Sequence, residues 1–504
     1  MNLASLTDYN LDTYGEYEAT IYDGRTYTNR ELFDAGRRLA NALTGLGFRP
    51  GERVAVMLPN CPEVGISYGG ILRMGGVVVP LLFLLATEEL QHILADSEAK
   101  AIITSPEFVA RAIEAANGCH PAPAVLVAGG TAEGALSFDG LVAAASPEAP
   151  LVDRASDDPA LFMYTSGTTG KPKGVVLTHG NMLHQAEAVH EISELDRTAM
   201  ALAVMPLAHA GGLVGWVAGT KNGARSVLMR WFDPELFCRN IQEYGVVATT
   251  LVPTMAALLL NHPAIDQYDL STLEQVAFGA SPAPTELIRN FERKTGATVR
   301  MVYGLTEAAP IVTADRITSP RKEGSSGFAI PGVELAIKDP DDVELKPGEL
   351  GEICVRGPNV MAGYHNLPEE TARTIRDGWL HTGDIGYLDE DGYLFIVDRV
   401  KDLIIRGGLN VYPHDVEEVL AAHPGVAEVA VVGIPDPTYG EEAEAFVVRR
   451  IGTEATEEDL LRHCREHLAK YKTPRRITFV PDLPRNQVGK VLKRVLRERV
   501  PRSS

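Results

Sequence analysis

The chain has few cysteines, no excess of basic residues and no long apolar run, and each absence removes a class of protein. Its five cysteines are scattered without a C-x-x-C pair, which gives no metal site and favours reduced thiols in a cytoplasmic protein. The formal net charge of −20 argues against nucleic-acid binding, which requires cationic patches. No apolar run approaches the roughly 20 residues of a transmembrane segment, and no signal peptide is visible.

The length of 504 residues is too great for one hydrophobic core and predicts two or more domains. A capping box, Thr28 to Glu31, opens an amphipathic helix. Apolar strands over 53–58, 76–80 and 101–103 follow and alternate with helical segments. This alternation predicts an α/β fold of layered sheets, with largely parallel strands.

The pattern of apolar and turn-forming residues changes twice towards the C-terminus. From about 324 to 398, short strands are separated by Pro-Gly, Asp-Gly and Gly-Glu turns, which predicts a small β-barrel or sandwich. We therefore expect a large N-terminal domain over 1–398, a short hinge at 399–401 and a small α+β domain over 402–504. In that last domain we expect strands near 426–434, 442–449 and 476–480 and a helix near 456–470.

The segment from Tyr164 to Gly174 carries the strongest functional signal. It is rich in Gly, Ser, Thr and Lys and follows the apolar run at 160–163, which is typical of a loop that binds a polyphosphate. The common nucleotide motif G-x-x-x-x-G-K-[ST] does not fit, because Thr165 stands where Gly is needed and Pro172 where Ser or Thr is needed. The simpler alternative is a polar surface loop.

Two further apolar strands end in Gly-rich loops, at 275–282 and at 299–307. In open α/β sheets, ligands bind beyond the carboxyl ends of the strands. We expect the three loops to converge on one nucleotide.

The order of these and later motifs resembles that of the adenylate-forming (AMP-binding) superfamily, in its acyl-CoA synthetase and CoA ligase branch. The later motifs are Met205 to Gly212, Trp379 to Asp384, Arg406 to Pro413 and Pro484 to Lys490. The chain departs from the family at Ala208, where an aromatic residue is usual, and at Asn486, where Thr is common.

The resemblance implies the roles of the site residues. Lys490 would be the catalytic lysine, Thr306 would contact the α-phosphate, Glu307 would hold Mg²⁺ and His209 would line the acyl pocket. Tyr303 would stack on adenine and Asp384 would accept from the ribose hydroxyls. The implied ATP- and AMP-binding residues are Thr165, Ser166, Gly167, Thr168, Thr169, Gly170, Lys171, Gly279, Ala280, Ser281, Tyr303, Gly304, Asp384 and Arg399.

The resemblance also implies how the second half-reaction is reached. The C-terminal domain would turn about Lys401, after which Arg406, Gly407 and Gly408 would face the coenzyme A arm. ATP and coenzyme A are therefore the expected co-substrates, with Mg²⁺ as the metal. The partners are small molecules, and a homodimer is left open.

The expected acyl pocket is apolar and offers no Lys or Arg to a second carboxylate, which disfavours dicarboxylates and amino acids. Its candidate residues are Gly212, Val214, Trp216, Met255, Leu305 and Ala308. A medium- or long-chain fatty acid is the first choice of substrate, and an aryl or arylpropenoic acid is the alternative. A P-loop-type ATPase and a non-catalytic nucleotide-binding protein are the alternatives from other classes.

Overall fold

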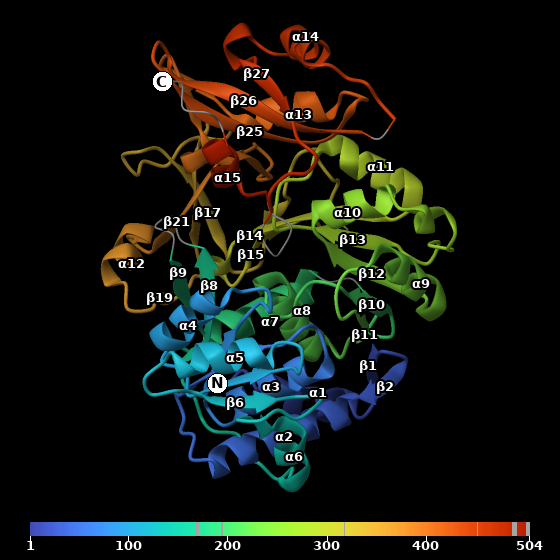
Figure 1. Cartoon of the computed structure of the whole chain (residues 1–504), viewed down its shortest axis with the longest axis vertical. Helices are drawn as coiled ribbons and strands as arrows, with labels where there is room; N and C mark the ends of the chain where they lie inside the picture. The colour runs from blue at the N-terminus through green and yellow to red at the C-terminus, as the bar shows by residue number, and fades with distance from the viewer. Residues whose placement is uncertain (167–170, 193–194, 317, 451, 486–490, 500–504) are drawn as a thin grey trace.

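The computed structural model describes residues 1–166, 171–192, 195–316, 318–450, 452–485 and 491–499. Figure 1 shows a large body that contains the first 400 residues and a smaller C-terminal domain at one end of it. Within the described residues, no helix is long and apolar enough to cross a membrane.

The first sheet of the body has eight strands in the order β19-β9-β8-β4-β3-β5-β6-β7. The strands are β3 (Arg53–Met57), β4 (Val77–Pro80), β5 (Ala101–Thr104), β6 (Ala124–Val127), β7 (Leu136–Ser137), β8 (Pro159–Ser166), β9 (Pro172–Thr178) and β19 (Gly363–Tyr364). Strands β3 to β8 run parallel to one another, whereas β9 is antiparallel to β8 and β19 is antiparallel to β9. The predicted strands at 53–58, 76–80 and 101–103 are confirmed.

The second sheet has nine strands in the order β16-β15-β14-β13-β12-β10-β11-β1-β2. The strands are β1 (Glu18–Tyr22), β2 (Arg25–Thr28), β10 (Met200–Ala203), β11 (Arg225–Leu228), β12 (Val246–Leu251), β13 (Gln275–Phe278), β14 (Thr298–Gly304), β15 (Ile311–Ala314) and β16 (Phe328–Ala329). Its central strands are parallel, so their carboxyl ends share one edge, as the loop pattern predicted.

Helices cover both faces of these sheets. They are α1 (Ser5–Tyr14), α2 (Asn29–Gly45), α3 (Pro62–Arg73), α4 (Thr87–Asp96), α5 (Val109–Asn117), α6 (Phe138–Ala144), α7 (His179–Ile192), α8 (Ala210–Asn222), α9 (Pro234–Tyr244), α10 (Pro253–Leu260), α11 (Thr285–Thr295) and α12 (Pro368–Thr374). The predicted capping box opens α2, where the Thr28 hydroxyl accepts from Glu31 N and the Glu31 carboxylate accepts from Thr28 N.

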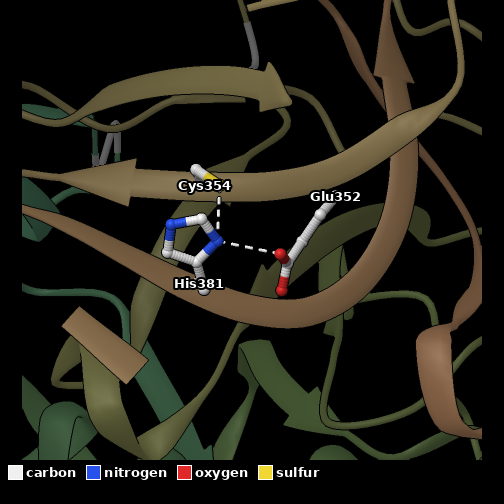
Figure 2. Close-up of side chains that lie close together, drawn as sticks. All are labelled: Glu352, Cys354 and His381. Carbon is white, nitrogen blue, oxygen red and sulfur yellow. Dashed lines mark hydrogen bonds and ion pairs between the residues drawn. The ribbon is translucent and has the colours of Figure 1, made fainter. Parts of the chain in front are cut away.

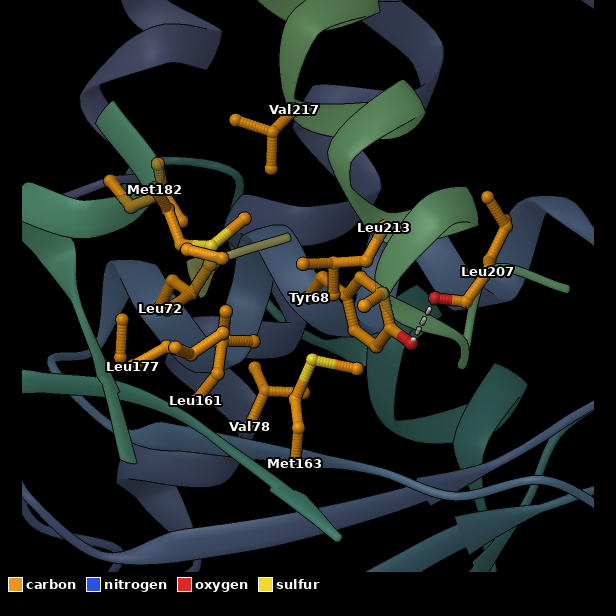
Figure 3. Close-up of a cluster of buried hydrophobic side chains, with 14 of the residues drawn as sticks. Tyr68, Leu72, Val78, Leu161, Met163, Leu177, Met182, Leu207, Leu213 and Val217 are labelled. Atoms are coloured by element: carbon orange, nitrogen blue, oxygen red, sulfur yellow. Dashed lines mark hydrogen bonds between the residues drawn. The ribbon is translucent and has the colours of Figure 1, made fainter. Parts of the chain in front are cut away.

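The largest core lies where α3, α7 and α8 pack on the eight-stranded sheet. Figure 3 shows Tyr68 of α3, Met182 of α7 and Leu213 of α8 above Leu161 and Met163 of β8. All are buried, and the Tyr68 hydroxyl donates to the Leu207 carbonyl across 3.1 Å. This packing fixes α8 beside both sheets, and α8 carries several of the predicted pocket residues.

The turn-rich segment predicted as a small β-barrel holds a five-stranded antiparallel sheet. Its strands are β17 (Glu334–Lys338), β18 (Gly351–Arg356), β20 (Ile375–Arg376), β21 (Trp379–Leu388) and β22 (Leu394–Arg399). The C-terminal domain follows a 3-10 turn, Val400–Asp402. It contains β23 (Ile404–Arg406), β24 (Leu409–Val411), β25 (Val426–Asp436), β26 (Gly440–Arg449), β27 (Arg476–Phe479), α13 (Pro413–Ala421), α14 (Glu457–His467) and α15 (Lys493–Arg499). The strands and the helix predicted there are confirmed.

The N-terminal segment is bound into the body by buried polar contacts. The Asn2 amide donates to the Leu72 carbonyl (2.7 Å), and Leu3 N donates to Nδ1 of the buried His179 (3.0 Å). The Asn10 amide donates to the Thr220 carbonyl at the end of α8 (2.7 Å). Residues at the start of the chain therefore brace elements that come 70 to 210 positions later.

Candidate active site

One large cavity, of about 2950 Å³, lies between the two large sheets, the five-stranded sheet and the C-terminal domain. Ligand pockets commonly measure about 300–1000 Å³, so this cavity has room for more than one small molecule. Of the sequence-predicted residues, it brings together on its wall Thr165, His209, Gly212, Val214, Trp216, Gly279, Ala280, Ser281, Tyr303, Gly304, Leu305, Thr306, Glu307, Asp384, Arg399 and Lys401.

The centre of the polar end is a triad of the buried Asp384 and Tyr303 with the partly exposed Arg399. The Tyr303 hydroxyl donates to Oδ2 of Asp384 (2.8 Å), and Nε of Arg399 donates to Oδ1 (2.7 Å). Asp384 and Tyr303 are 6% and 8% exposed. Burial and the Asp384 charge raise the pKa of Tyr303 well above its usual value, so the phenol stays a hydrogen-bond donor.

Arg399 and Lys401 both line the polar end of the cavity, but their pKa values shift in opposite directions. Burial lowers the pKa of Lys401, and the nearby Arg399 charge lowers it further. Burial also works against the charge of Arg399, but Asp384 outweighs it and raises the Arg399 pKa. Of Arg399 and Lys401, Lys401 is therefore the more easily neutralised.

A tight turn after β14 presents Thr306 and Glu307. Leu305 N donates to the Pro310 carbonyl across 3.0 Å, and residues 306–308 form a 3-10 turn. Gly304 is required here, because a Cβ would lie 1.9 Å from the same Pro310 oxygen. The turn thus holds both side chains at the edge of the cavity.

The Glu307 carboxylate is oriented by Tyr364, whose hydroxyl donates to Oε1 across 2.9 Å. Burial and Glu307 together raise the pKa of Tyr364, which keeps that donor protonated. A carboxylate held in this way by a neighbouring donor suits a hard divalent cation, with the Thr306 hydroxyl beside it in the chain. Tyr364 carries no sequence signal, because it lies outside every recognised motif.

The predicted phosphate loop connects β8 to β9, whose ladder ends with the pairs Thr165–Lys173 and Ser166–Pro172. Gly167, Thr168, Thr169 and Gly170 lie outside the described residues, as does the side chain of Ser166. Lys171 is exposed and is not among the residues that line the cavity in the described part of the chain.

Lys173, which lies in the predicted phosphate-binding segment but was given no role of its own, lies on the cavity wall. It pairs with Glu370 and places its Nζ 5.4 Å from the centre of the Tyr364 ring. Through Tyr364 this lysine is linked to Glu307, so it belongs to the polar end of the site.

The apolar end of the cavity runs along α8. His209 caps this helix, its Nδ1 accepting from Gly211 N across 3.2 Å. Gly212 is packed so closely on the preceding loop that a Cβ would lie 2.1 Å from the Pro206 carbonyl oxygen. Trp216 is held edge-on against Tyr68, with ring centres 5.6 Å apart.

Beyond Trp216, the cavity wall reaches Ala19 and Phe33 near the N-terminus. Arg225 also lies on this wall, although the predicted pocket had no cation. It pairs with Glu18 across 3.1 Å, so its charge is already matched. The Arg225 charge at this end of the cavity is therefore paired with Glu18.

Two predicted pocket residues lie elsewhere. Ala308 is fully buried in the main core, and Met255 packs against the core under α9 and α10. Neither is among the cavity-lining residues of the described chain. Their apolar character identified them as buried, but only the fold separates a packed core from a pocket wall.

Residues on either side of the predicted catalytic-lysine segment lie on the cavity wall. Arg485 and Val491 form an antiparallel bridge and both line the cavity. Lys490 lies outside the described residues, but the loop that carries it begins and ends on the cavity wall.

The other segment, the β23–β24 hairpin, is not among the described residues that line the cavity. Gly407 and Gly408 turn the hairpin with φ of 57° and 83°, a region that favours glycine. Arg406 donates from Nε and Nη2 to the two carboxylate oxygens of Glu442, each across 2.7 Å.

Comparisons with known proteins agree with this geometry. A family model for the AMP-binding enzyme matches residues 8–365, and one for the AMP-binding enzyme C-terminal domain matches residues 415–490. A long-chain-fatty-acid–CoA ligase of Bacillus subtilis is 36% identical over 526 residues, covering 98% of this chain and 94% of that protein.

Two further matches also cover nearly the whole chain. A feruloyl-CoA synthase of an Amycolatopsis species is 39% identical over 485 residues, covering 95% of each chain. Among solved structures, ATP-bound MatB from Rhodopseudomonas palustris superposes with a TM-score of 0.91 at 33% identity, covering 99% of each chain.

Proposed function

Because this chain belongs to the AMP-binding enzyme family, in its acyl-CoA ligase branch, and is an AMP-forming acyl-CoA synthetase, we propose that its acid is a medium- or long-chain fatty acid. The observation that carries this proposal is the large cavity, which joins the polar Asp384–Glu307 end to an apolar wall along α8. An acyl chain on that wall would place its carboxylate near His209 and the phosphate loop.

In the first half-reaction the acid carboxylate attacks the α-phosphate of ATP and pyrophosphate leaves. Asp384 accepts from the ribose hydroxyls, and Thr306 donates to the α-phosphate. Ser166, Thr168 and Thr169 bind the β- and γ-phosphates. Mg²⁺ held by Glu307 would neutralise phosphate charge. Lys490 stabilises the negative charge that builds up on the reacting oxygens.

The position of the C-terminal domain supports adenylate formation as the half-reaction to which this arrangement corresponds. Arg485 and Val491, which flank the segment that carries Lys490, line the cavity, whereas the Gly407–Gly408 hairpin is not among the described residues that line it. Rotation about Lys401 would exchange the two segments and bring the thiol of coenzyme A to the acyl-adenylate. Thioester and AMP are the products.

The second candidate is an arylpropenoic acid, and the similarity to feruloyl-CoA synthase favours it. Trp216 would then lie along an aromatic ring rather than beside an alkyl chain. For either acid we place the reaction in the cytoplasm, where ATP and coenzyme A are available; all five cysteines are free and buried.

The test is pyrophosphate release with Mg-ATP and a panel of carboxylic acids, with and without coenzyme A, resolving AMP from ADP. We expect acid-dependent AMP and pyrophosphate, highest with alkyl chains of medium or greater length, and faster turnover with coenzyme A. A preference for cinnamic-type acids would select the second candidate, and formation of ADP would contradict the mechanism.

A further inference from the structure

The strand that carries Asp384 is irregular where Asp384 occurs. Along the β18–β21 ladder, Cys354 pairs with His381 and Glu352 pairs with Ile385. Between these two pairs, β18 advances by two residues and β21 by four, so residues 382–384 have no partner on β18. Bulges of this kind often re-aim a side chain beside an active site.

Side chains satisfy the backbone groups that the bulge leaves without ladder partners. Gly383 N donates to Oε1 of Glu352 across 2.9 Å, and Asp384 N donates to the Thr382 hydroxyl across 3.1 Å. The Thr382 hydroxyl in turn donates to the Ile353 carbonyl across 2.7 Å. Glu352 is thus the carboxylate that accepts from Gly383 N, and it holds the residue directly before Asp384.

The other oxygen of Glu352 fixes the start of the same turn. Oε2 lies 2.8 Å from Nδ1 of His381, whose ring also lies 3.4 Å from Sγ of Cys354. Figure 2 shows the imidazole between the thiol and the carboxylate. One carboxylate therefore contacts both residue 381 and residue 383, on either side of Thr382.

These three side chains are also of the types that bind metal ions, but the contacts favour a hydrogen-bond network. Nη2 of Arg376 lies 2.6 Å from the same Nδ1 of His381, so a cation already occupies this position. Burial, with the nearby Glu352 charge, raises the pKa of Cys354 to about 12, so the thiol is not a preformed thiolate ligand.

We propose that Glu352 is a positioning residue for the nucleotide: its carboxylate fixes the 381–383 turn and thereby aims Asp384 at the ribose hydroxyls. This inference rests on the proposed role of Asp384. Gly383 has φ of 71°, which glycine adopts freely, so its own conformational preference does not hold the turn and the Glu352 contact is needed to fix it. Loss of the Glu352 acceptor would let the turn relax and would tilt the Asp384 carboxylate away from the sugar.

The experiment compares ATP with 2′,3′-dideoxy-ATP, which lacks both ribose hydroxyls, in acid-dependent pyrophosphate release. We expect Glu352→Ala to raise KM for ATP about tenfold, with kcat little changed, because a charge-assisted hydrogen bond is lost. KM for dideoxy-ATP should stay within about twofold, since that nucleotide gains nothing from Asp384. Glu352→Gln keeps a carbonyl acceptor and should recover most of the ATP affinity.

Glu349→Ala is the matched control, because Glu349 also accepts from a backbone N–H, that of Lys346, but in a turn away from the cavity. It should alter neither nucleotide's KM. An equal rise for both nucleotides in Glu352→Ala would mean general loosening and would overturn the proposal. If Glu352→Ala does not fold, the KM values of Glu352→Gln for the two nucleotides are compared instead. We then expect KM to rise about threefold for ATP and not for dideoxy-ATP.

The failure of the underlying role has a different signature. Wild-type enzyme that uses ATP and dideoxy-ATP equally would remove the ribose role of Asp384, and the Glu352 proposal with it. Wild-type preference for ATP that Glu352→Ala leaves intact would overturn the Glu352 proposal alone.

Discussion

Replacing Gly304 with Ala tests whether the turn after β14 controls the chemistry. Gly304 has no positive φ, so an alanine backbone is allowed there and only the added methyl group matters. That Cβ would lie 1.9 Å from the Pro310 oxygen and 2.8 Å from its carbonyl carbon, whereas ordinary contact begins near 3.4 Å. Both neighbours are backbone atoms, so a rotamer change cannot relieve the overlap.

The size of the effect follows from the required displacement. Strands β14 and β15 must separate locally by about 1.5 Å (3.4 minus 1.9), which also stretches the Leu305 N–Pro310 O hydrogen bond. Overpacking of this kind costs about 1–3 kcal/mol, and the weakened bond about 1 kcal/mol more. Thr306 and Glu307 follow the turn, and a shift of about 1 Å in a reacting geometry costs about 100-fold in rate.

The assay is acid-dependent exchange of labelled pyrophosphate into ATP, with the thermal midpoint measured on the same samples. We expect Gly304→Ala to stay folded with a lower midpoint and to lose about 100-fold in exchange rate. Gly45→Ala is the control, because the site at the end of α2 has open space and no positive φ. A Gly304→Ala enzyme with wild-type exchange and an unchanged midpoint would refute the reasoning.

Three further changes have defined outcomes. Lys490→Ala should abolish adenylate formation yet spare thioester formation from supplied acyl-adenylate; equal loss in both assays would contradict its assigned role. Trp216 separates the acyl end of the cavity from a space of about 40 Å³ behind it, so Trp216→Ala should shift the kcat/KM preference towards longer acids by tenfold or more. Replacing the exposed Trp231 with Ala is the control and should leave the preference unchanged. An unchanged chain-length profile in Trp216→Ala would count against the pocket. Burial, and then the Arg154 charge, lowers the pKa of His179 to about 4 in the folded protein. Between pH of about 6.5 and about 4 the unfolded chain therefore binds a proton that the folded protein does not. The free energy of unfolding should fall by up to about 3 kcal/mol as pH drops from about 6.5 to about 4. Denaturant titrations should show a flatter pH profile for His179→Asn, and identical profiles would be inconsistent with this linkage.

The fold was predictable where local signals and periodicity agree. The Thr28 capping box, the apolar runs of β3 to β5 and the strands of the C-terminal domain all occur where the sequence places them. The pairing of β1 with β11, more than 200 residues away, was not predictable, because nothing local in either strand specifies its neighbour.

The candidate site divides in the same way. Tyr303, Glu307 and Asp384 follow motif spacing, and the structure brings all three to one cavity. Tyr364 and Lys173 were missed because their importance comes from contacts across the fold, with Glu307 and Glu370. Met255 and Ala308 were expected on the pocket wall but pack in or against the cores, and an apolar residue in the sequence does not show which of the two it will line.

The bracing of α8 by the N-terminal segment has a practical consequence for comparing related enzymes. Asn10 donates to the Thr220 carbonyl and accepts from the Asn29 amide, and both Thr220 and Asn29 line the cavity. Differences in the first thirty residues would therefore alter which acids are accepted, although these residues lie far in sequence from every motif. A truncated or tagged N-terminus should accordingly be checked for altered substrate preference before chain-length data from different preparations are compared.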